Sequence, residues 1–218
     1  MQVWTASFLD CQDRFAVLQE CIKSVHALNL PHFISVSTHN VEMIQHIKIL
    51  FPNLTIYVHE QRLSQFEHIA HLLLQSNSDD HTNLIFLDDD DLLLNIPTEG
   101  FHAKQYSSHI WNYKNSIQYQ SYCPYNEKDS VSYDFSGATC TQHQLRIFLD
   151  HMANYLSLPT LDLVFNAFIN NPNDPGPPIV FRRKWDPYVY KKPWDSYQSS
   201  CSLGDVMKYA TSKKLIRT

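Results

Sequence analysis

Glycine is scarce in this sequence, and its scarcity excludes two common phosphate-binding loops. The 218 residues include four glycines, Gly100, Gly137, Gly176 and Gly204. A dinucleotide fingerprint and a Walker loop each need several glycines within a few residues, between a strand and a helix. Any phosphate-bearing ligand must therefore be held by a metal ion and by basic side chains.

Long apolar runs and long basic runs are also missing. No apolar run approaches the roughly 20 residues of a membrane helix, and the N-terminal MQVWTASFLD lacks the pattern of a signal peptide. The formal net charge is −5 and no basic run exceeds a few residues, which argues against a nucleic-acid partner. We therefore expect a soluble, cytoplasmic protein that neither spans a membrane nor binds nucleic acid.

Cysteine usage fits neither a disulfide framework nor a zinc site, because the five cysteines are odd in number and widely spaced. We expect buried thiols at Cys11, Cys21, Cys123, Cys140 and Cys201. The length and the 44% hydrophobic share are sufficient for one large core. The sequence therefore predicts a single domain over residues 1–218.

The first half of the chain alternates between two hydrophobic patterns. Runs of β-branched and aromatic residues predict four strands, at 3–8, 33–38, 54–59 and 84–87. Apolar residues three and four apart predict three intervening helices, with these buried faces: Phe15, Leu18, Ile22 and Val25; Ile44 and Ile47; Ile69, Leu72 and Leu73. Such alternation predicts an α/β fold with a mostly parallel sheet and helices on both faces.

Polar residues mark the starts of these helices. Asp10 is expected to cap the first helix and Asn40 the second. Ser64 and Glu67 form the capping-box pattern ahead of the third. The second half is less regular, with strands expected at 116–123 and 131–140, helices at 142–156 and 161–170, a strand or ordered loop at 179–185, and a terminal helix capped by Ser202.

The segment TNLIFLDDDDLLLN carries the clearest chemical signal. An apolar run, 84–87, leads directly into Asp88, Asp89, Asp90 and Asp91. Ligands of parallel sheets bind beyond the carboxyl ends of the strands, which is where these carboxylates are expected. Oxygen ligands at short spacing suit magnesium or manganese, whose shell is completed by water and substrate phosphates. The alternative is a solvated acidic turn at a helix start.

The aspartate segment resembles a known signature. IFLDDDDLL is similar to the metal-binding DXD motif of GT-A fold glycosyltransferases, particularly the family-2-like group. TASFLDCQDRFAVLQECIKSV resembles that group's opening strand and helix, with Asp13 and Arg14 at a common Asn-Arg or Asp-Arg pair. DFSGATCTQHQL resembles the strand bordering the acceptor site, with Gly137 in its turn. The resemblance covers roughly residues 3–170, and a looser likeness exists to the compact glycosyltransferase domains with which large algal viruses decorate their capsids.

The resemblance implies a GT-A-like, Rossmann-type fold with a mixed, mostly parallel sheet. Residues 1–95 would form the nucleotide-sugar-binding half and 96–218 the acceptor-binding half. The implied donor is a UDP-sugar carrying a hexosyl or deoxyhexosyl group, with a glycan or protein-linked acceptor. Its pyrophosphate would lie on Mn²⁺ or Mg²⁺ held by Asp88 and Asp90. Asp89 and Asp91 satisfy the same spacing, and in the family one aspartate contacts the donor, so Asp89 is also a candidate donor ligand.

The segment LPTLDLVFNAF resembles the family's catalytic Glu-Asp pair, with Leu161 in place of the glutamate and Asp162 in place of the aspartate. Asp162 is thus the candidate general base of an inverting transfer, since a base must reach the acceptor hydroxyl. The alternative is that Asp162 caps a helix. In that case a retaining mechanism stays open.

Thr5, Ala6 and Ser7 end the first expected strand, which in the family contacts the base, and Arg62 follows the third expected strand at the same carboxyl edge. Arg14 is a further donor-binding candidate, and Arg182 and Arg183, beside Trp185 and Trp194, are candidates to close over the pyrophosphate and sugar. Arginine offers a bidentate fork to phosphate. The alternative is a surface arginine at Arg62 and a solvated basic loop at Arg182 and Arg183. His68 and His71 share a helix face, and we expect a helix surface there in preference to a metal pair.

Two other function classes remain open. Haloacid-dehalogenase-like phosphatases also place a magnesium-binding DxD after a buried strand, although near the N-terminus, whereas three expected strands precede it here. A non-catalytic domain that binds a sugar nucleotide is the second, because a fold alone does not establish activity. Turnover of a nucleotide sugar distinguishes the enzyme from both.

Overall fold

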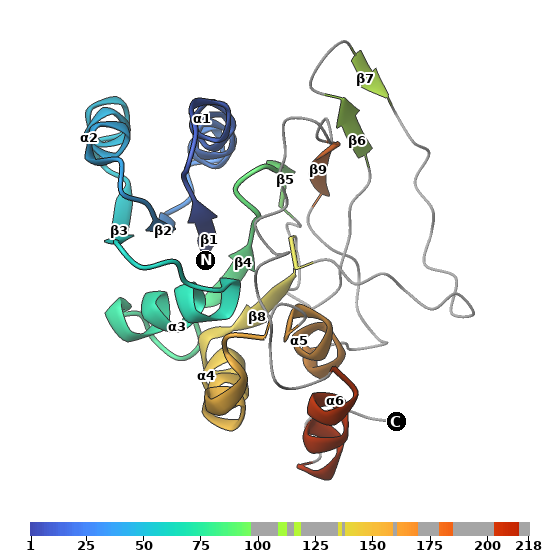
Figure 1. Ribbon diagram of the computed structural model, residues 1–218. Coiled ribbons are helices and arrows are strands. Elements are labelled where there is room, and N and C mark those ends of the chain that lie inside the picture. The colour runs from blue at the N-terminus through green and yellow to red at the C-terminus, as the bar shows by residue number, and fades with distance from the viewer. Residues whose placement is uncertain are drawn as a thin grey trace.

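The main sheet places the aspartate segment at the end of an interior strand. The computed structural model describes residues 1–96, 109–112, 116–118, 135–136, 138–158, 161–169, 179–184 and 203–213. Five strands pair in the order β3-β2-β1-β4-β8 (Figure 1). Their bounds are Gln2–Phe8 for β1, His32–Ser37 for β2, Thr55–His59 for β3, Asn83–Phe86 for β4 and Thr139–Thr141 for β8.

The strand directions confirm the predicted fold class. β1 runs parallel to β2 and to β4, β2 runs parallel to β3, and β8 pairs antiparallel with β4. The first four strands were each predicted within two residues of their observed bounds. The chain is therefore an α/β protein with a Rossmann-type mixed, mostly parallel sheet, and the carboxyl ends of its parallel strands share one edge.

Helices cover both faces of this sheet (Figure 1). Helices α1 and α2, Gln12–Ala27 and Val41–Leu50, lie on one face, and α3 and α4, Gln65–Gln75 and Gln142–Met152, lie on the other. Strand side chains alternate between the two faces, so neighbouring residues enter different cores. Ile34 packs with Ile22 and Ile47 in the core under α1 and α2. Phe86 and Phe66 belong to the larger core under α3 and α4.

The helix starts agree with the sequence at two of three predicted caps. The Asn40 side chain accepts a hydrogen bond from Met43 N at 3.0 Å. Ser64 and Glu67 form the complete capping box at the start of α3. Asp10, in contrast, is exposed and is not the cap of α1; the N-cap is Cys11, whose side chain makes no capping bond. The Asp10 prediction was wrong by one position, because the chain stays extended through Cys11.

The described part of the second half agrees with the sequence in outline. α4 ends earlier than predicted and is followed by a 3-10 turn, Ala153–Tyr155. Helix α5 spans Leu161–Ile169, and helix α6 spans Leu203–Ser212. Of the strand expected at 131–140, only 139–140 lie in β8, and residues 131–134 and 137 fall outside the described residues. Ser202, the expected cap of the last helix, also falls outside them.

A second, smaller sheet has the order β5-β9-β6-β7. Its strands are Leu92–Asn95, Ile179–Lys184, His109–Asn112 and Ser116–Gln118 in that order. For the segment 179–185 the sequence predicted either a strand or an ordered loop, and residues 179–184 form the strand β9. Residue 185 falls outside the described residues. β5 begins directly after Asp91, so the aspartates form the connection between the two sheets.

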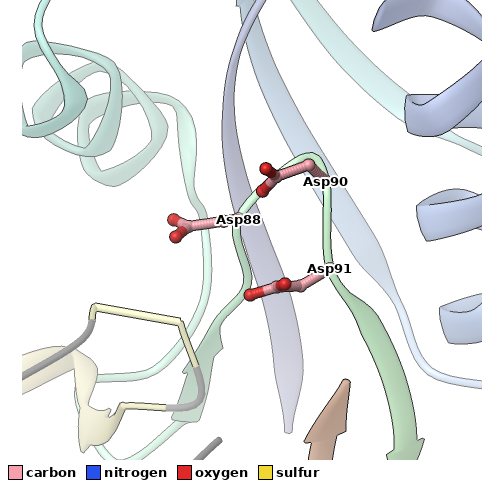
Figure 2. Close-up of side chains that lie close together, drawn as sticks. All are labelled: Asp88, Asp90 and Asp91. Atoms are coloured by element: carbon pink, nitrogen blue, oxygen red, sulfur yellow. The ribbon is translucent and has the colours of Figure 1, made fainter. Parts of the chain in front are cut away.

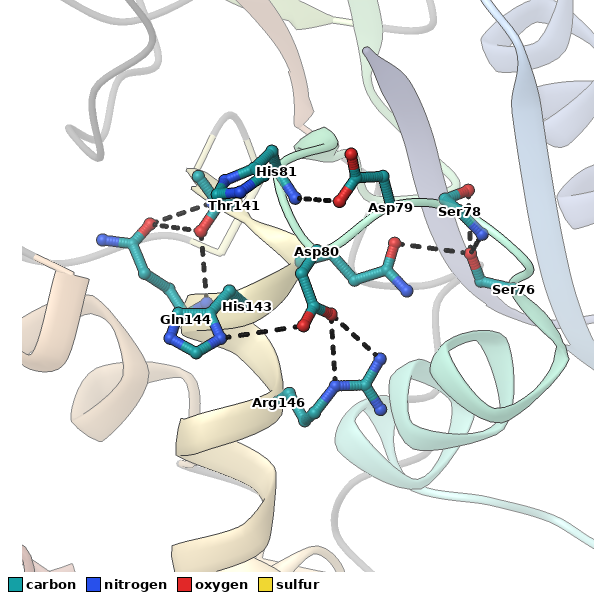
Figure 3. A network of polar contacts seen from close by, with 10 residues as sticks. Ser76, Ser78, Asp79, Asp80, His81, Thr141, His143, Gln144 and Arg146 are labelled. Carbon is teal, nitrogen blue, oxygen red and sulfur yellow. Dashed lines mark hydrogen bonds and ion pairs between the residues drawn. The ribbon is translucent and has the colours of Figure 1, made fainter.

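A polar network attaches α4 to the loop that precedes β4 (Figure 3). Arg146 donates to Asp80 Oδ1 at 3.2 Å, and Asp79 Oδ1 accepts from His81 N at 3.1 Å. Thr141 and Gln144 form a second capping box at the start of α4. These bonds fix the amino end of β4, the edge opposite the aspartates.

Two further expectations meet the structure here. Cys21 and Cys140 are buried as predicted, but Cys11 is exposed at the start of α1, so the expectation of a buried thiol was wrong there. Cys123 and Cys201 fall outside the described residues. Among the described residues, no helix combines the length and apolarity required to cross a membrane.

Candidate functional site

Three carboxylates gather in the turn between β4 and β5 (Figure 2). Asp88, Asp90 and Asp91 each offer an oxygen, and these atoms all lie within 4.8 Å of one another. Asp91 N donates to Asp88 O at 3.1 Å, which closes the turn and brings the side chains to the same side of it. The turn stands at the carboxyl edge of the parallel sheet, where the sequence predicted a ligand site.

Neighbouring elements hold Asp88 in place. Gln65, in the first turn of α3, donates from Nε2 to Asp88 Oδ1 at 3.0 Å. Ser136 Oγ accepts from the backbone N–H of Asp88 at 3.1 Å, and Cys21 Sγ lies 3.6 Å from the Asp88 carbonyl oxygen. The orientation of Asp88 thus depends on α1, α3 and the segment before β8 together.

Asp89 faces a different set of partners. Arg14 Nη2 lies 3.0 Å from Asp89 Oδ1 and 2.7 Å from Oδ2. Ser7 Oγ donates to Oδ2 at 2.6 Å. The Asp89 side chain is 10% exposed and that of Arg14 is 12% exposed. The charge of Asp89 is therefore largely satisfied within the protein, while its three neighbours form the cluster.

A cavity of about 160 Å³ adjoins the aspartates. Asp88, Asp89 and Asp90 line it, and Arg62 also lines it. The Arg62 guanidinium carbon lies 4.8 Å from the centre of the Phe8 ring, at the end of β1. Arg62 also lines a larger neighbouring cavity of about 780 Å³, formed where the carboxyl ends of β1, β2 and β3 meet the loops that follow them. Phe8 and Arg62 line both cavities.

The donor set fits a hard divalent cation. In an octahedral shell with metal–oxygen bonds of about 2.0–2.1 Å, ligand oxygens lie roughly 3–4 Å apart, close to the spacing limit of this cluster. Two unit charges about 4 Å apart repel by about 1 kcal/mol in bulk water and by about 4 kcal/mol at an effective dielectric constant near 20. A cation between the carboxylates removes this repulsion. Asp88, Asp90 and Asp91 are therefore able to hold Mg²⁺ or Mn²⁺.

The other predicted site residues are distributed unevenly. Ala6, Ser7, Arg14 and Arg62 line the cavity beside the aspartates. Thr5 is fully buried instead, with its hydroxyl 2.9 Å from His32 Nε2. Asp162 is half-buried in the first turn of α5, one residue inside the helix. The alternative prediction, that Asp162 is the N-cap of this helix, was therefore wrong. Arg182 and Arg183 lie on β9 and pair with Ile110 and Trp111 of β6.

Two contributors were missed from the sequence, a third was named only as an alternative and a fourth was misplaced. Gln65 and Ser136 were not predicted, and Asp91 was named only as an alternative register. His68 was expected on a helix surface, but it is 2% exposed and lines the cavity. Its position four residues before Leu72 places it on the buried face of α3, and that spacing was a usable signal.

The chain is similar to several solved structures at low sequence identity. No protein-family model matches the sequence, and no curated protein matches it. The solved structure of GalNAc-T7 with UDP, GalNAc and Mn²⁺ is 10% identical, with a TM-score of 0.49 over 98% of this chain and 49% of that one. The inositol-1-phosphate CTP transferase from T. maritima is 10% identical, with a TM-score of 0.49 over 84% of this chain and 85% of that one.

A third structure, S. aureus TarS 1-349, is 14% identical, with a TM-score of 0.31 over 43% of this chain and 29% of that one. The matched region therefore spans less than half of the TarS and GalNAc-T7 chains. What the chain does must be inferred from its own site.

Proposed function

We propose that the chain is a metal-dependent glycosyltransferase that moves a sugar from a UDP-sugar donor to a glycan or protein-linked acceptor. The observation that carries the proposal is the cluster of Asp88, Asp90 and Asp91 at the carboxyl edge of a parallel sheet, beside a cavity that Arg62 also lines. A site of three carboxylates is strongly anionic. It therefore suits a ligand whose phosphates arrive with a divalent cation.

Each group then has a proposed role. Asp88 and Asp90 hold the cation as the resemblance implies, and the structure adds Asp91 as a third candidate ligand. When bound, the cation supplies a Lewis acid that neutralises charge on the departing diphosphate. Arg62 donates hydrogen bonds to the phosphates. The larger cavity, which Arg62 also lines, receives the nucleoside.

The role of Asp89 changes in this proposal. The sequence named it as a donor contact, but its carboxylate is engaged by Arg14 and Ser7. We assign Asp89 and Arg14 to positioning the turn, since an ion pair between α1 and the turn keeps the three neighbouring carboxylates together. Ser7 supports the same pair. None of these three is proposed as a phosphate ligand.

Transfer itself requires a base on the acceptor side. Asp162 takes the proton of the acceptor hydroxyl as its oxygen bonds to the anomeric carbon, and the bond from that carbon to the diphosphate oxygen breaks. UDP leaves with the electron pair. An inverting outcome follows from this single displacement. A role for Arg182 and Arg183 at the pyrophosphate stays a prediction from their own segment. The division into a donor half at 1–95 and an acceptor half at 96–218 stays a prediction of the resemblance.

UDP release tests this function. The chain would be incubated with Mn²⁺ and a panel of UDP-hexoses and UDP-deoxyhexoses, with and without glycan acceptors. We expect release to depend on Mn²⁺ and to fall roughly 100-fold or more in Asp88→Asn and Asp90→Asn. Asp150→Asn, on the exposed side of α4, is the matched control.

Two further measurements, combined with UDP release, separate the alternative functions. Hydrolysis of an aryl phosphate with no UDP release from any sugar nucleotide would favour the phosphatase class. Tight UDP-sugar binding without turnover under any condition would favour a non-catalytic binding domain. Either result would contradict the transferase proposal.

A further inference from the structure

A chain of hydrogen bonds runs from β3 through β2 and α3 to the loop that carries Arg62. Its members are His59 at the end of β3, Ser35 and Ser37 in β2, and His68 in α3. Ser35 and Ser37 lie two residues apart, so both face α3. Ser35, Ser37 and His68 are each at most 2% exposed, so most of these hydrogen bonds are shielded from water.

The proton positions along this chain follow from the end nearest the loop. Ser37 Oγ donates to the carbonyl oxygen of Gln61 at 2.8 Å and accepts from Leu63 N at 3.0 Å. A hydroxyl has one proton, and Ser37 has used it on Gln61. Ser37 Oγ must therefore accept from His68 Nε2, which lies 3.1 Å away, so Nε2 carries a hydrogen.

The remaining protons are then determined. His68 is neutral, because burial and the neighbouring His59 and His71 lower its pKa from 6.5 to about 3. Its Nδ1 is consequently bare and accepts from Ser35 Oγ at 2.8 Å. With the Ser35 proton used on His68, His59 Nε2 must donate to Ser35 Oγ, also at 2.8 Å. The direction runs without reversal from His59 to Gln61.

Ser37 is the point at which this direction acts on the loop. Its oxygen makes one donated and two accepted bonds, which is its full capacity. Gln61 and Leu63 flank Arg62, and both are bonded to this one oxygen. If one hydroxyl or imidazole of the network exchanged its donor and acceptor roles, a hydrogen bond would be lost. The network therefore favours one arrangement of the loop.

We propose that His68 and Ser37 are positioning residues that hold the 61–63 loop so that Arg62 stays at the aspartate cavity. Gln65, one turn before His68 and Ile69 in α3, bonds Asp88. The same helix start therefore orients the cation-binding side through Gln65 and the arginine side through His68. The nucleotide-binding consequence rests on the proposed function, whereas the proton order and the loop restraint do not.

The proton order can be measured on the unaltered chain by long-range ¹H–¹⁵N NMR of the histidine rings. We expect His68 and His59 to be protonated at Nε2 and bare at Nδ1, between pH 7 and 8. A hydrogen on His68 Nδ1 would overturn the proposal, because Ser35 would then be unable to donate to it. This measurement needs no variant and no ligand.

The loop restraint is measured by hydrogen exchange at Leu63 N in Ser37→Ala. We expect exchange there to accelerate about tenfold or more, as its acceptor is lost. Ser78→Ala is the matched control, since Ser78 also belongs to a serine hydrogen-bond cluster, at the opposite edge of the sheet. Unchanged exchange at Leu63 in a folded Ser37→Ala chain would overturn the restraint.

A double-mutant cycle connects the restraint to Arg62. Ser37→Ala should weaken Mn²⁺–UDP binding about tenfold in the native background and by less than about twofold when Arg62→Gln is present. Equal weakening in both backgrounds, or no weakening in the native one, would overturn the positioning role. If the native chain binds no UDP, the proposed function fails, while the NMR and exchange results still decide the proton order and restraint.

Discussion

Arg14 and Asp89 form a close ion pair, with Arg14 Nη2 2.7 Å from Asp89 Oδ2. The pair joins the first turn of α1 to the aspartate turn, which lies 75 residues further along the chain. Its partners are shielded, so removing one of them strands a charge with little access to water. The ion pair thus keeps Asp89 apart from the carboxylate cluster that the other three aspartates form.

Loss of this pair should destabilise the protein. We expect Asp89→Asn to lower the free energy of unfolding by roughly 3 kcal/mol, because Arg14 keeps its charge in a mostly buried position. Urea unfolding at pH 7 measures the change. Arg146→Ala is the control, since its pair with Asp80 is about half-exposed and should contribute less than about 1 kcal/mol. Equal effects in the two variants would contradict the structural role of Asp89.

Asp90→Asn should stabilise the protein in the absence of metal. Removing one of three clustered charges relieves repulsion, and the thermal midpoint should rise by roughly 2–4 °C in EDTA. Added Mn²⁺ should then raise the midpoint of the native chain more than that of the variant, since ligand stabilisation follows affinity. A lower midpoint in EDTA with an undiminished Mn²⁺ effect would show that Asp90 is a structural residue and not a metal ligand.

Stability should also fall with acidification through His68. Burial lowers the pKa of His68 from 6.5 to about 3 in the folded protein. Below about pH 6.5 His68 binds a proton in the unfolded chain but stays neutral in the folded protein. The free energy of unfolding therefore decreases as pH falls from about 6.5 towards 3. The contribution is about 1.4 kcal/mol per pH unit.

Urea unfolding at pH 7, 6 and 5 tests this dependence. The slope should be shallower in His68→Gln than in the native chain, and unchanged in His143→Gln, where the side chain is 59% exposed. Other acid-sensitive groups, including buried His32, affect all three chains alike. Equal slopes in the native chain and His68→Gln would mean that His68 binds a proton equally well in the folded and unfolded states, which contradicts a lowered pKa.

The elements that the sequence predicts well depend on short-range regularities. Ser64 and Glu67 are three residues apart, and that spacing alone brings each side chain to the other's backbone. The run 84–87 ends at Asp88 because buried apolar residues give way to carboxylates at the sheet edge. Such features need no knowledge of distant neighbours, which explains why both were predicted correctly.

The features that the sequence does not predict depend on distant partners. The four aspartates are identical in type, and the positions of Arg14 and Ser7 separate Asp89 from the others. His68 becomes a buried, neutral ring because Ser35 and Ser37 satisfy both of its nitrogens across the α3–β2 interface. The spacing of His68 before Leu72 indicates that the ring is buried, but it does not indicate the two serines. These contacts do not follow from a local pattern, because the residues meet only once the sheet order is known.

The central claim is that Asp88 and Asp90 bind a metal ion that in turn binds a nucleoside diphosphate. Calorimetric titration of UDP with and without Mn²⁺ tests it most directly, on the native chain, on Asp88→Ala with Asp90→Ala, and on the control Asp79→Ala with Asp150→Ala. We predict binding that needs both Mn²⁺ and the first pair of aspartates and is unaffected in the control. Binding of equal strength without Mn²⁺ or without Asp88 and Asp90, or no binding in any chain, would contradict the account.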